Sequence, residues 1–162
     1  MENLLDKTVA EATALLEENS CRYSQDYGHM GPEAFVFYVE ALANYLDSRG
    51  SDEDGDFAYF MIRTFTDRLK WDGMEIAAAV PTMRRFCARA VADFERLGFE
   101  EKYRKRLGRR VAEFEVAVGL LECPPASGRL ALGSGDQVTE ERGGFEGAGP
   151  LLGAGGVDGH GE

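Results

Sequence analysis

The sequence predicts an all-α protein, a compact bundle of five or six helices with a flexible, Gly-rich C-terminal tail. Apolar residues in much of residues 1–123 recur every three or four positions, which is the period of an α-helix. The composition then changes, because 12 of the 20 glycines lie in residues 128–162, where few apolar residues remain to form a core. We therefore expect one helical domain at residues 1–123 and a disordered tail at residues 124–162.

The first predicted helix covers residues 3–18. Its apolar positions follow one another at spacings of four, three and four, so that they share one helical face: Leu5, Val9, Ala12 and Leu16. Residues 20–30 show no such period and are interpreted as a connecting loop.

A second helix is predicted from Pro32 to about Asp47, because Gly31 and Pro32 are typical residues for a helix cap and a first helical position. This helix is apolar nearly all round, which is typical of a central helix that neighbours cover on several sides. A third helix is predicted at residues 57–69, where large apolar side chains repeat every fourth residue.

Asp72 and Glu75 have the spacing of a capping box and predict the start of another helix. Pro81 should break or kink this helix near Val80, because a proline inside a helix removes a hydrogen bond. The helical pattern resumes over residues 82–97.

The last predicted helix covers residues 99–121 and follows Gly98, a residue that commonly ends a helix. Its apolar positions show the cleanest periodicity of the chain: Tyr103, Leu107, Val111, Phe114, Val118 and Leu121.

The net charge of −11 is unevenly distributed. Residues 1–83 contain 6 basic and 16 acidic side chains, whereas residues 84–110 contain 10 basic and 4 acidic ones. Within that basic segment, six of the nine residues from 102 to 110 are Lys or Arg. The segment is therefore the strongest candidate for a binding surface.

We predict that a partner is bound by basic residues of this segment: Arg85, Arg89, Lys102, Lys105, Arg106 and Arg109. An acidic protein is one candidate partner, and the phosphates of a nucleic acid are a second one, which the net negative charge of the chain disfavours. The structural alternative is that these cations offset the acidic first half of the molecule.

The sequence predicts no catalytic residue, no cofactor and no metal site. Residues 52–56 are similar to a calcium loop, but placing Gly55 at its sixth position puts Gly50 and Met61 where oxygen ligands are needed. Cys21 and His29 flank one predicted loop, yet they lack the close spacing of zinc ligands. A small hydrolase or metal enzyme that uses the His29 loop remains a further alternative.

Three widely separated cysteines indicate reduced thiols rather than a disulfide framework: Cys21, Cys87 and Cys123. Cys87 is interpreted as a small core residue. The N-terminal residues lack the pattern of a signal peptide, and no stretch reaches the roughly 18 apolar residues of a membrane span. We therefore expect a cytoplasmic protein with no membrane partner.

The segment at residues 31–46 contains Pro32, Glu33, Ala34 and Phe35, followed by a tyrosine and an alanine at positions 38 and 41. It resembles a PEAF-x-x-Y-x-x-A segment of small uncharacterised helical bacterial proteins, some of which are found beside immunity-type genes. The resemblance implies a helical domain without established catalytic residues. Our leading hypothesis is a non-enzymatic cytoplasmic protein that acts through protein–protein interaction.

Overall fold

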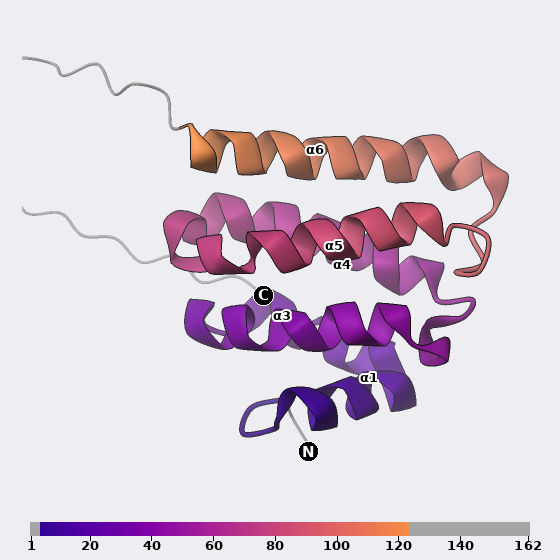
Figure 1. Ribbon diagram of the computed structural model, residues 1–162, viewed down its shortest axis with the longest axis horizontal. Coiled ribbons are helices and arrows are strands. Elements are labelled where there is room, and N and C mark those ends of the chain that lie inside the picture. The colour runs from indigo at the N-terminus through magenta and orange to yellow at the C-terminus, as the bar shows by residue number, and fades with distance from the viewer. Residues whose placement is uncertain (1–3, 124–162) are drawn as a thin grey trace, which may run out of the picture. The chain divides into compact units, whose positions relative to one another are not determined.

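The structure is a computed structural model that describes residues 4–123, and the predicted tail lies outside the described residues. Six α-helices, one of them a single turn, and three 3-10 helices form this part of the chain (Figure 1). In chain order they are α1 Val9–Ser24, α2 Asp26–His29, α3 Pro32–Asp47, η1 Arg49–Ser51, α4 Gly55–Asp72, η2 Gly73–Ala79, α5 Val80–Ala92, η3 Glu101–Tyr103 and α6 Arg104–Glu122. The all-α prediction is confirmed.

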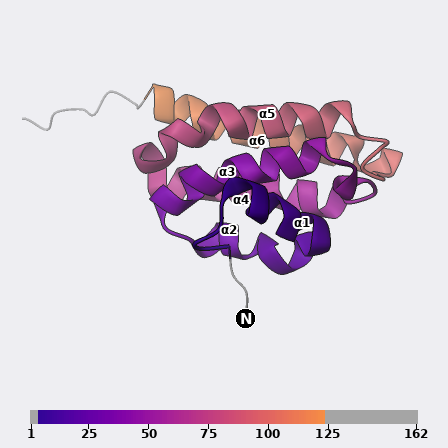
Figure 2. The ribbon, with the colours of Figure 1, turned by 60° about the horizontal axis from the view of Figure 1, so that its bottom comes forward.

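The helices of residues 4–123 are stacked with α3 and α4 in the middle. Figure 2 shows α1 and α2 on one side of this pair and α5 and α6 on the other. The helices α4 and α6 run in the same direction, because Tyr59 contacts Arg110 near their N-terminal ends and Leu69 shares a groove with Leu120 near their C-terminal ends. In Figure 1, α5 runs in the opposite direction to both.

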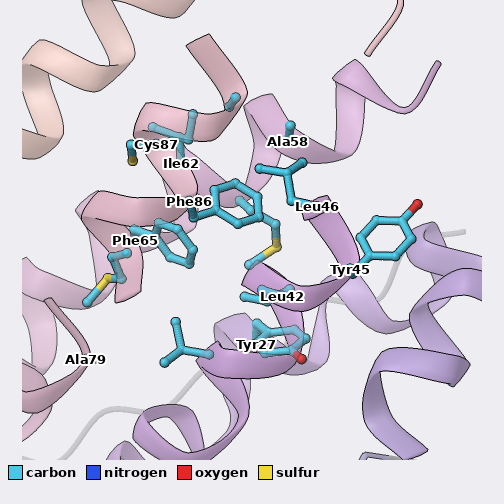
Figure 3. Close-up of a cluster of buried hydrophobic side chains, with 14 of the residues drawn as sticks. Tyr27, Leu42, Tyr45, Leu46, Ala58, Ile62, Phe65, Ala79, Phe86 and Cys87 are labelled. Atoms are coloured by element: carbon cyan, nitrogen blue, oxygen red, sulfur yellow. The ribbon is translucent and has the colours of Figure 1, made fainter. Parts of the chain in front are cut away.

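The core lies around α3 and α4, and α3 is central, as its nearly continuous apolar sequence predicts. Phe65 of α4 lies at the centre of an aromatic cluster, with its ring centroid 6.2 Å from Phe35, 5.2 Å from Phe86 and 6.3 Å from Phe114. These rings come from α3, α5 and α6, and such contacts each add about 0.5–1.5 kcal/mol beyond burial alone. Figure 3 shows Phe65 and Phe86 side by side, with Leu42 and Leu46 of α3 nearby.

The start of the first helix differs from the prediction. The helix α1 begins at Val9 because Thr8 and Glu11 form a capping box, in which each side chain accepts a hydrogen bond from the backbone N–H of the other residue. Leu4 is buried in the turn before this cap, whereas Leu5, which was expected on the buried face, is 48% exposed.

The loop predicted at residues 20–30 is wrong, because α1 continues to Ser24 and α2 follows it. Asn19 leaves helical geometry, and its Oδ1 accepts a hydrogen bond from the backbone N–H of Arg22, which restarts the helix after a kink. Tyr23 and Tyr27, which follow the kink, are both buried. Buried contacts therefore order a segment whose sequence has no helical period.

The break near Val80 is confirmed, but the capping box before it is wrong. Asp72 makes no capping hydrogen bond, and the segment that follows it is the 3-10 helix η2. The helix α5 begins at Val80, with Pro81 in its first turn, where a missing N–H costs little. It ends at Ala92 rather than at residue 97.

The turn after α5 depends on Gly98, which adopts a φ of +73°. A Cβ atom at this position would lie 3.1 Å from Glu53 Cα, so the turn requires glycine both for its conformation and for close packing. The last helix begins at Arg104, after η3, rather than at residue 99, and its predicted core face is confirmed by the buried Leu107, Phe114 and Val118.

Arg68 is a buried cation that the sequence analysis did not single out. Its Nη1 donates to the backbone oxygen of Met30 at 2.6 Å, and its guanidinium lies 4.7 Å from the centroid of the Phe35 ring. Its Nε lies 2.5 Å from the Asp72 carboxylate. Arg68 therefore joins α4 to the turn between α2 and α3, and it engages the carboxylate that was expected to cap a helix.

Candidate functional site

The structure divides the basic segment into two clusters with different surroundings. We call Arg84, Arg85, Arg89 and Arg96 the α5 cluster, because three lie on α5 and the fourth in the turn after it. We call Lys105, Arg106 and Arg109 the α6 cluster.

Carboxylates from distant parts of the chain pair with the α5 cluster. Arg85 Nη2 lies 2.7 Å from Glu40 Oε1, and Arg89 Nε lies 3.1 Å from Asp47 Oδ1, so that α5 is joined to the acidic α3. Arg89 also lies 3.0 Å from Asp93. For these two predicted partner-binding residues, the structure shows the internal neutralisation that the sequence left as an alternative.

Arg84 pairs with α6 instead. Its guanidinium lies 3.1 Å from Glu115 and 3.0 Å from Glu122, and hydrogen bonds to these two carboxylates raise the pKa of Arg84. This bridge fastens one flank of α6 to α5.

Arg96 is the most fully engaged member of the α5 cluster. It donates to the backbone oxygens of Leu46 at 2.7 Å and Ser48 at 3.2 Å, which lie at the C-terminal end of α3. Its Nη1 lies 2.7 Å from Asp52 Oδ1, and this hydrogen bond raises the pKa of Arg96. Arg96 thereby satisfies helix-end carbonyls that α3 leaves without partners of its own.

The α6 cluster has no such partners. Within residues 4–123, no carboxylate forms an ion pair with Lys105, Arg106 or Arg109, and all three side chains are exposed. Arg106 contacts the Tyr103 ring, with 5.7 Å between its guanidinium carbon and the ring centroid. Lys102, the sixth predicted site residue, is held by Glu100 at 2.8 Å, which raises its pKa.

The α6 cluster continues into an apolar row on the same helix. Successive positions at spacings of four, three, four and four share one face, because an α-helix turns by about 100° per residue. We call this row the α6 stripe, and it consists of Lys105, Arg109, Ala112, Val116 and Leu120. All five residues are exposed, and the exposed fractions of Val116 and Leu120 are 65% and 60%. The stripe is basic in its first half and apolar in its second half.

A groove of about 610 Å³ runs between the apolar half of the stripe and α4. Thr66, Leu69 and Lys70 of α4 form one wall, and Val116 and Leu120 of α6 form the other. The short side chains of Ala112, Ala117 and Thr66 leave this space between the two helices.

The sequence contains a second apolar row on α6, which the stronger periodicity of the core-facing residues made easy to overlook. Val116 and Leu120 lie outside the set of apolar positions that packs the core, and together with Ala112 they form a second apolar row. A helix with two apolar rows on different faces indicates a second surface to be covered.

The residues considered for chemistry lie apart from these clusters. His29 is exposed at the end of α2 and lines a cavity of about 250 Å³ with Asp26, Met30 and the residues at positions 4 and 5. Cys21, also exposed, is not among the described residues lining that cavity. Cys87 is buried as predicted, and burial raises the pKa of its thiol to about 12.

The acidic turn at residues 52–56 makes structural contacts. One oxygen of Asp54 accepts hydrogen bonds from Ser20 at 2.5 Å and from Tyr45 at 2.6 Å. The described residues contain no group of three or more His, Cys, Asp or Glu side chains placed to hold a metal ion. None of the helices described is both long enough and apolar enough to span a bilayer.

Comparisons with protein-family models, curated proteins and solved structures found no match. The function is therefore argued from the arrangement of the described residues.

Proposed function

We propose that this chain is a non-enzymatic protein that binds an acidic protein partner through the exposed face of α6. The observation that carries the proposal is the contrast in pairing, because the α5 cluster is neutralised internally whereas the α6 cluster is not. Exposed cations beside an exposed apolar row are typical of a recognition surface, where charge steers the approach and apolar burial stabilises the complex.

We place this activity in the cytoplasm. Cys21 and Cys123 are exposed free thiols, and free thiols persist in the reducing environment of that compartment.

Affinity purification from native lysate with matched variants tests the proposal. Lys105→Glu/Arg109→Glu reverses two unpaired cations, and Arg85→Glu/Arg89→Glu makes the same charge change at the same spacing on α5. We expect a stoichiometric protein to be recovered with the wild type and the α5 variant and lost with the α6 variant. Recovery of the same proteins with all three would contradict the proposal, provided that circular dichroism shows each variant folded.

The second candidate function is nucleic-acid association, which the three unpaired cations of the α6 cluster favour. Pairing of the α5 cluster, together with the ion pairs that Lys102, Arg104 and Arg110 form with nearby glutamates, leaves these three of the ten basic residues for phosphate binding. Three phosphate contacts predict that the logarithm of the binding constant falls with the logarithm of salt concentration at a slope of about −2.7. Fluorescence anisotropy with labelled DNA and RNA checks this, and no retention at low salt would remove the candidate.

A further inference from the structure

The α4–α6 groove is an exposed apolar surface between two parallel helices. Its α6 wall consists of Val116 and Leu120, which lie on the face of α6 turned away from the core residues Phe114 and Val118. Within residues 4–123, no side chain of the fold covers these positions.

The shape of the groove fits a helix. It extends along α6 from Arg109 to Leu121, which corresponds to about 18 Å at the rise of an α-helix. A third helix lying in a groove between two helices places apolar side chains at spacings of three and four against both walls. About 12 residues of such a helix would match the length of this groove.

The rim of the groove is predominantly basic. Arg109 lies at one end without a carboxylate partner among the described residues, and Lys70 lies on the α4 wall toward the other end. Lys70 Nζ is 3.9 Å from Asp67 Oδ1, at the limit of an ion pair. Glu113 is the one carboxylate among the described lining residues, and Arg110 Nη1 neutralises it at 2.7 Å. Carboxylates of a partner would therefore find cations toward both ends.

We propose that the α4–α6 groove binds an amphipathic helix of a partner protein, whose apolar face contacts Val116 and Leu120 and whose flanking carboxylates pair with Arg109 and Lys70. The inference rests on the proposed function and specifies the kind of segment that is recognised. The unpaired Lys105 and Arg106 extend the basic surface by one turn beyond the groove, so that acidic residues following the docked helix would also be attracted.

A designed peptide tests the groove without knowledge of the natural partner. The probe is a fluorescein-labelled peptide of about 18 residues, long enough for the groove and its rim, with Leu at spacings of three and four and Glu on the flanking positions. One control peptide has the same composition with the leucines scattered around the helix, and another has Lys in place of Glu. We expect fluorescence anisotropy to show that the full chain binds the probe about tenfold more tightly than either control, a difference of about 1.4 kcal/mol.

The matching protein variants replace exposed side chains, which keeps the fold intact. Val116→Ser/Leu120→Ser should weaken binding of the probe by about tenfold or more, because truncation removes the apolar contacts of one wall. Val91→Ser is the control, since Val91 is 46% exposed on α5 and does not line the groove. It should leave the affinity unchanged. Equal binding of the probe and the scattered peptide, or no effect of the double variant, overturns the proposal.

Absence of probe binding by the full chain also overturns it. Sedimentation analysis then identifies the occupant, because a dimer that dissociates on Val116→Ser/Leu120→Ser would show that a second copy covers the groove. Failure of the peptide experiment does not affect the affinity purification with charge variants, so the proposed function and this inference can fail separately.

Discussion

The two basic clusters of residues 84–110 have similar composition and opposite surroundings. Arg85 and Arg89 face Glu40 and Asp47, which come from a helix about forty residues earlier, whereas Lys105 and Arg109 face solvent. The difference arises because α5 packs against the acidic α3, while the basic stripe of α6 lies opposite its core-facing residues. A count of charges along the sequence cannot separate structural cations from cations available for binding, because their partners are set by tertiary packing.

The largest expected effect on stability comes from Arg96→Ala. The substitution removes hydrogen bonds to the carbonyls of Leu46 and Ser48 and leaves Asp52 without its cation. Hydrogen bonds from charged groups contribute about 1.5–3 kcal/mol, so we expect the free energy of unfolding to fall by about 2 kcal/mol. Urea denaturation measures this, and Arg109→Ala should change it by less than about 0.5 kcal/mol. Equal effects of the two substitutions would remove the distinction between the clusters.

A charge reversal within each cluster should give a smaller difference. Arg89→Glu places a third carboxylate beside Asp47 and Asp93, and we expect a loss of about 1 kcal/mol in the free energy of unfolding. Arg109→Glu has no neighbouring ion pair to break, and it should leave the stability within about 0.5 kcal/mol of wild type. Thermal denaturation at low salt shows which of the two variants is less stable. A greater loss of stability for Arg109→Glu than for Arg89→Glu would contradict the division into a paired α5 cluster and an unpaired α6 cluster.

The sequence was sufficient for those features of the fold that depend on local chemistry. Gly31 and Pro32 predicted the start of α3, and Pro81 predicted the break before α5, because both act on the backbone of their own turn. The core face of α6 also followed its period. The capping box of Thr8 and Glu11 is equally local, but Leu5, at helical spacing from Val9, predicted an earlier start.

Features that depend on distant contacts could not be predicted. Asp72 has the spacing of a cap, yet it pairs with Arg68, which contacts with the distant Met30 and Phe35 hold in a buried position. Tyr23 and Tyr27 likewise order a segment without periodicity. The candidate site was predicted as one basic surface, and its division into paired and unpaired clusters required the packing of α5 on α3. The prediction that the six basic residues bind a partner stays a prediction.

A double-mutant cycle should detect a still smaller effect, the coupling energy between an arginine of the α5 cluster and its carboxylate partner. For Glu40→Gln and Arg85→Gln, we expect a coupling of about 0.5 kcal/mol in the free energy of unfolding, as is typical of exposed ion pairs. The same cycle with Glu40→Gln and Arg106→Gln should give no coupling, because the structure shows no ion pair between these residues. A coupling as large for Arg106 as for Arg85 would be inconsistent with the two clusters as described.

The smallest expected effect concerns a carboxylate whose partner is the backbone rather than an arginine. A hydrogen bond from the Thr8 N–H lowers the pKa of the Glu11 carboxyl group in the folded protein. The ionised carboxylate therefore stabilises α1 at pH values above the pKa of about 4.3 that glutamate has in the unfolded chain. This stabilisation is lost as the pH falls through the lowered folded pKa. The melting temperatures of wild type and Glu11→Gln should therefore differ at pH 6 and converge toward pH 2. A difference that persists unchanged at low pH would contradict the capping role.

The claim that α6 recognises a partner while α5 supports the fold is tested most directly by binding affinity. Once a partner has been purified, titration calorimetry measures its affinity for Lys105→Glu/Arg109→Glu and for Arg85→Glu/Arg89→Glu, two variants with equal changes of charge. The arrangement of ion pairs predicts that the α6 variant binds at least about tenfold more weakly than wild type and the α5 variant about equally well. Equal weakening by both variants, or greater weakening by the α5 variant, would contradict it.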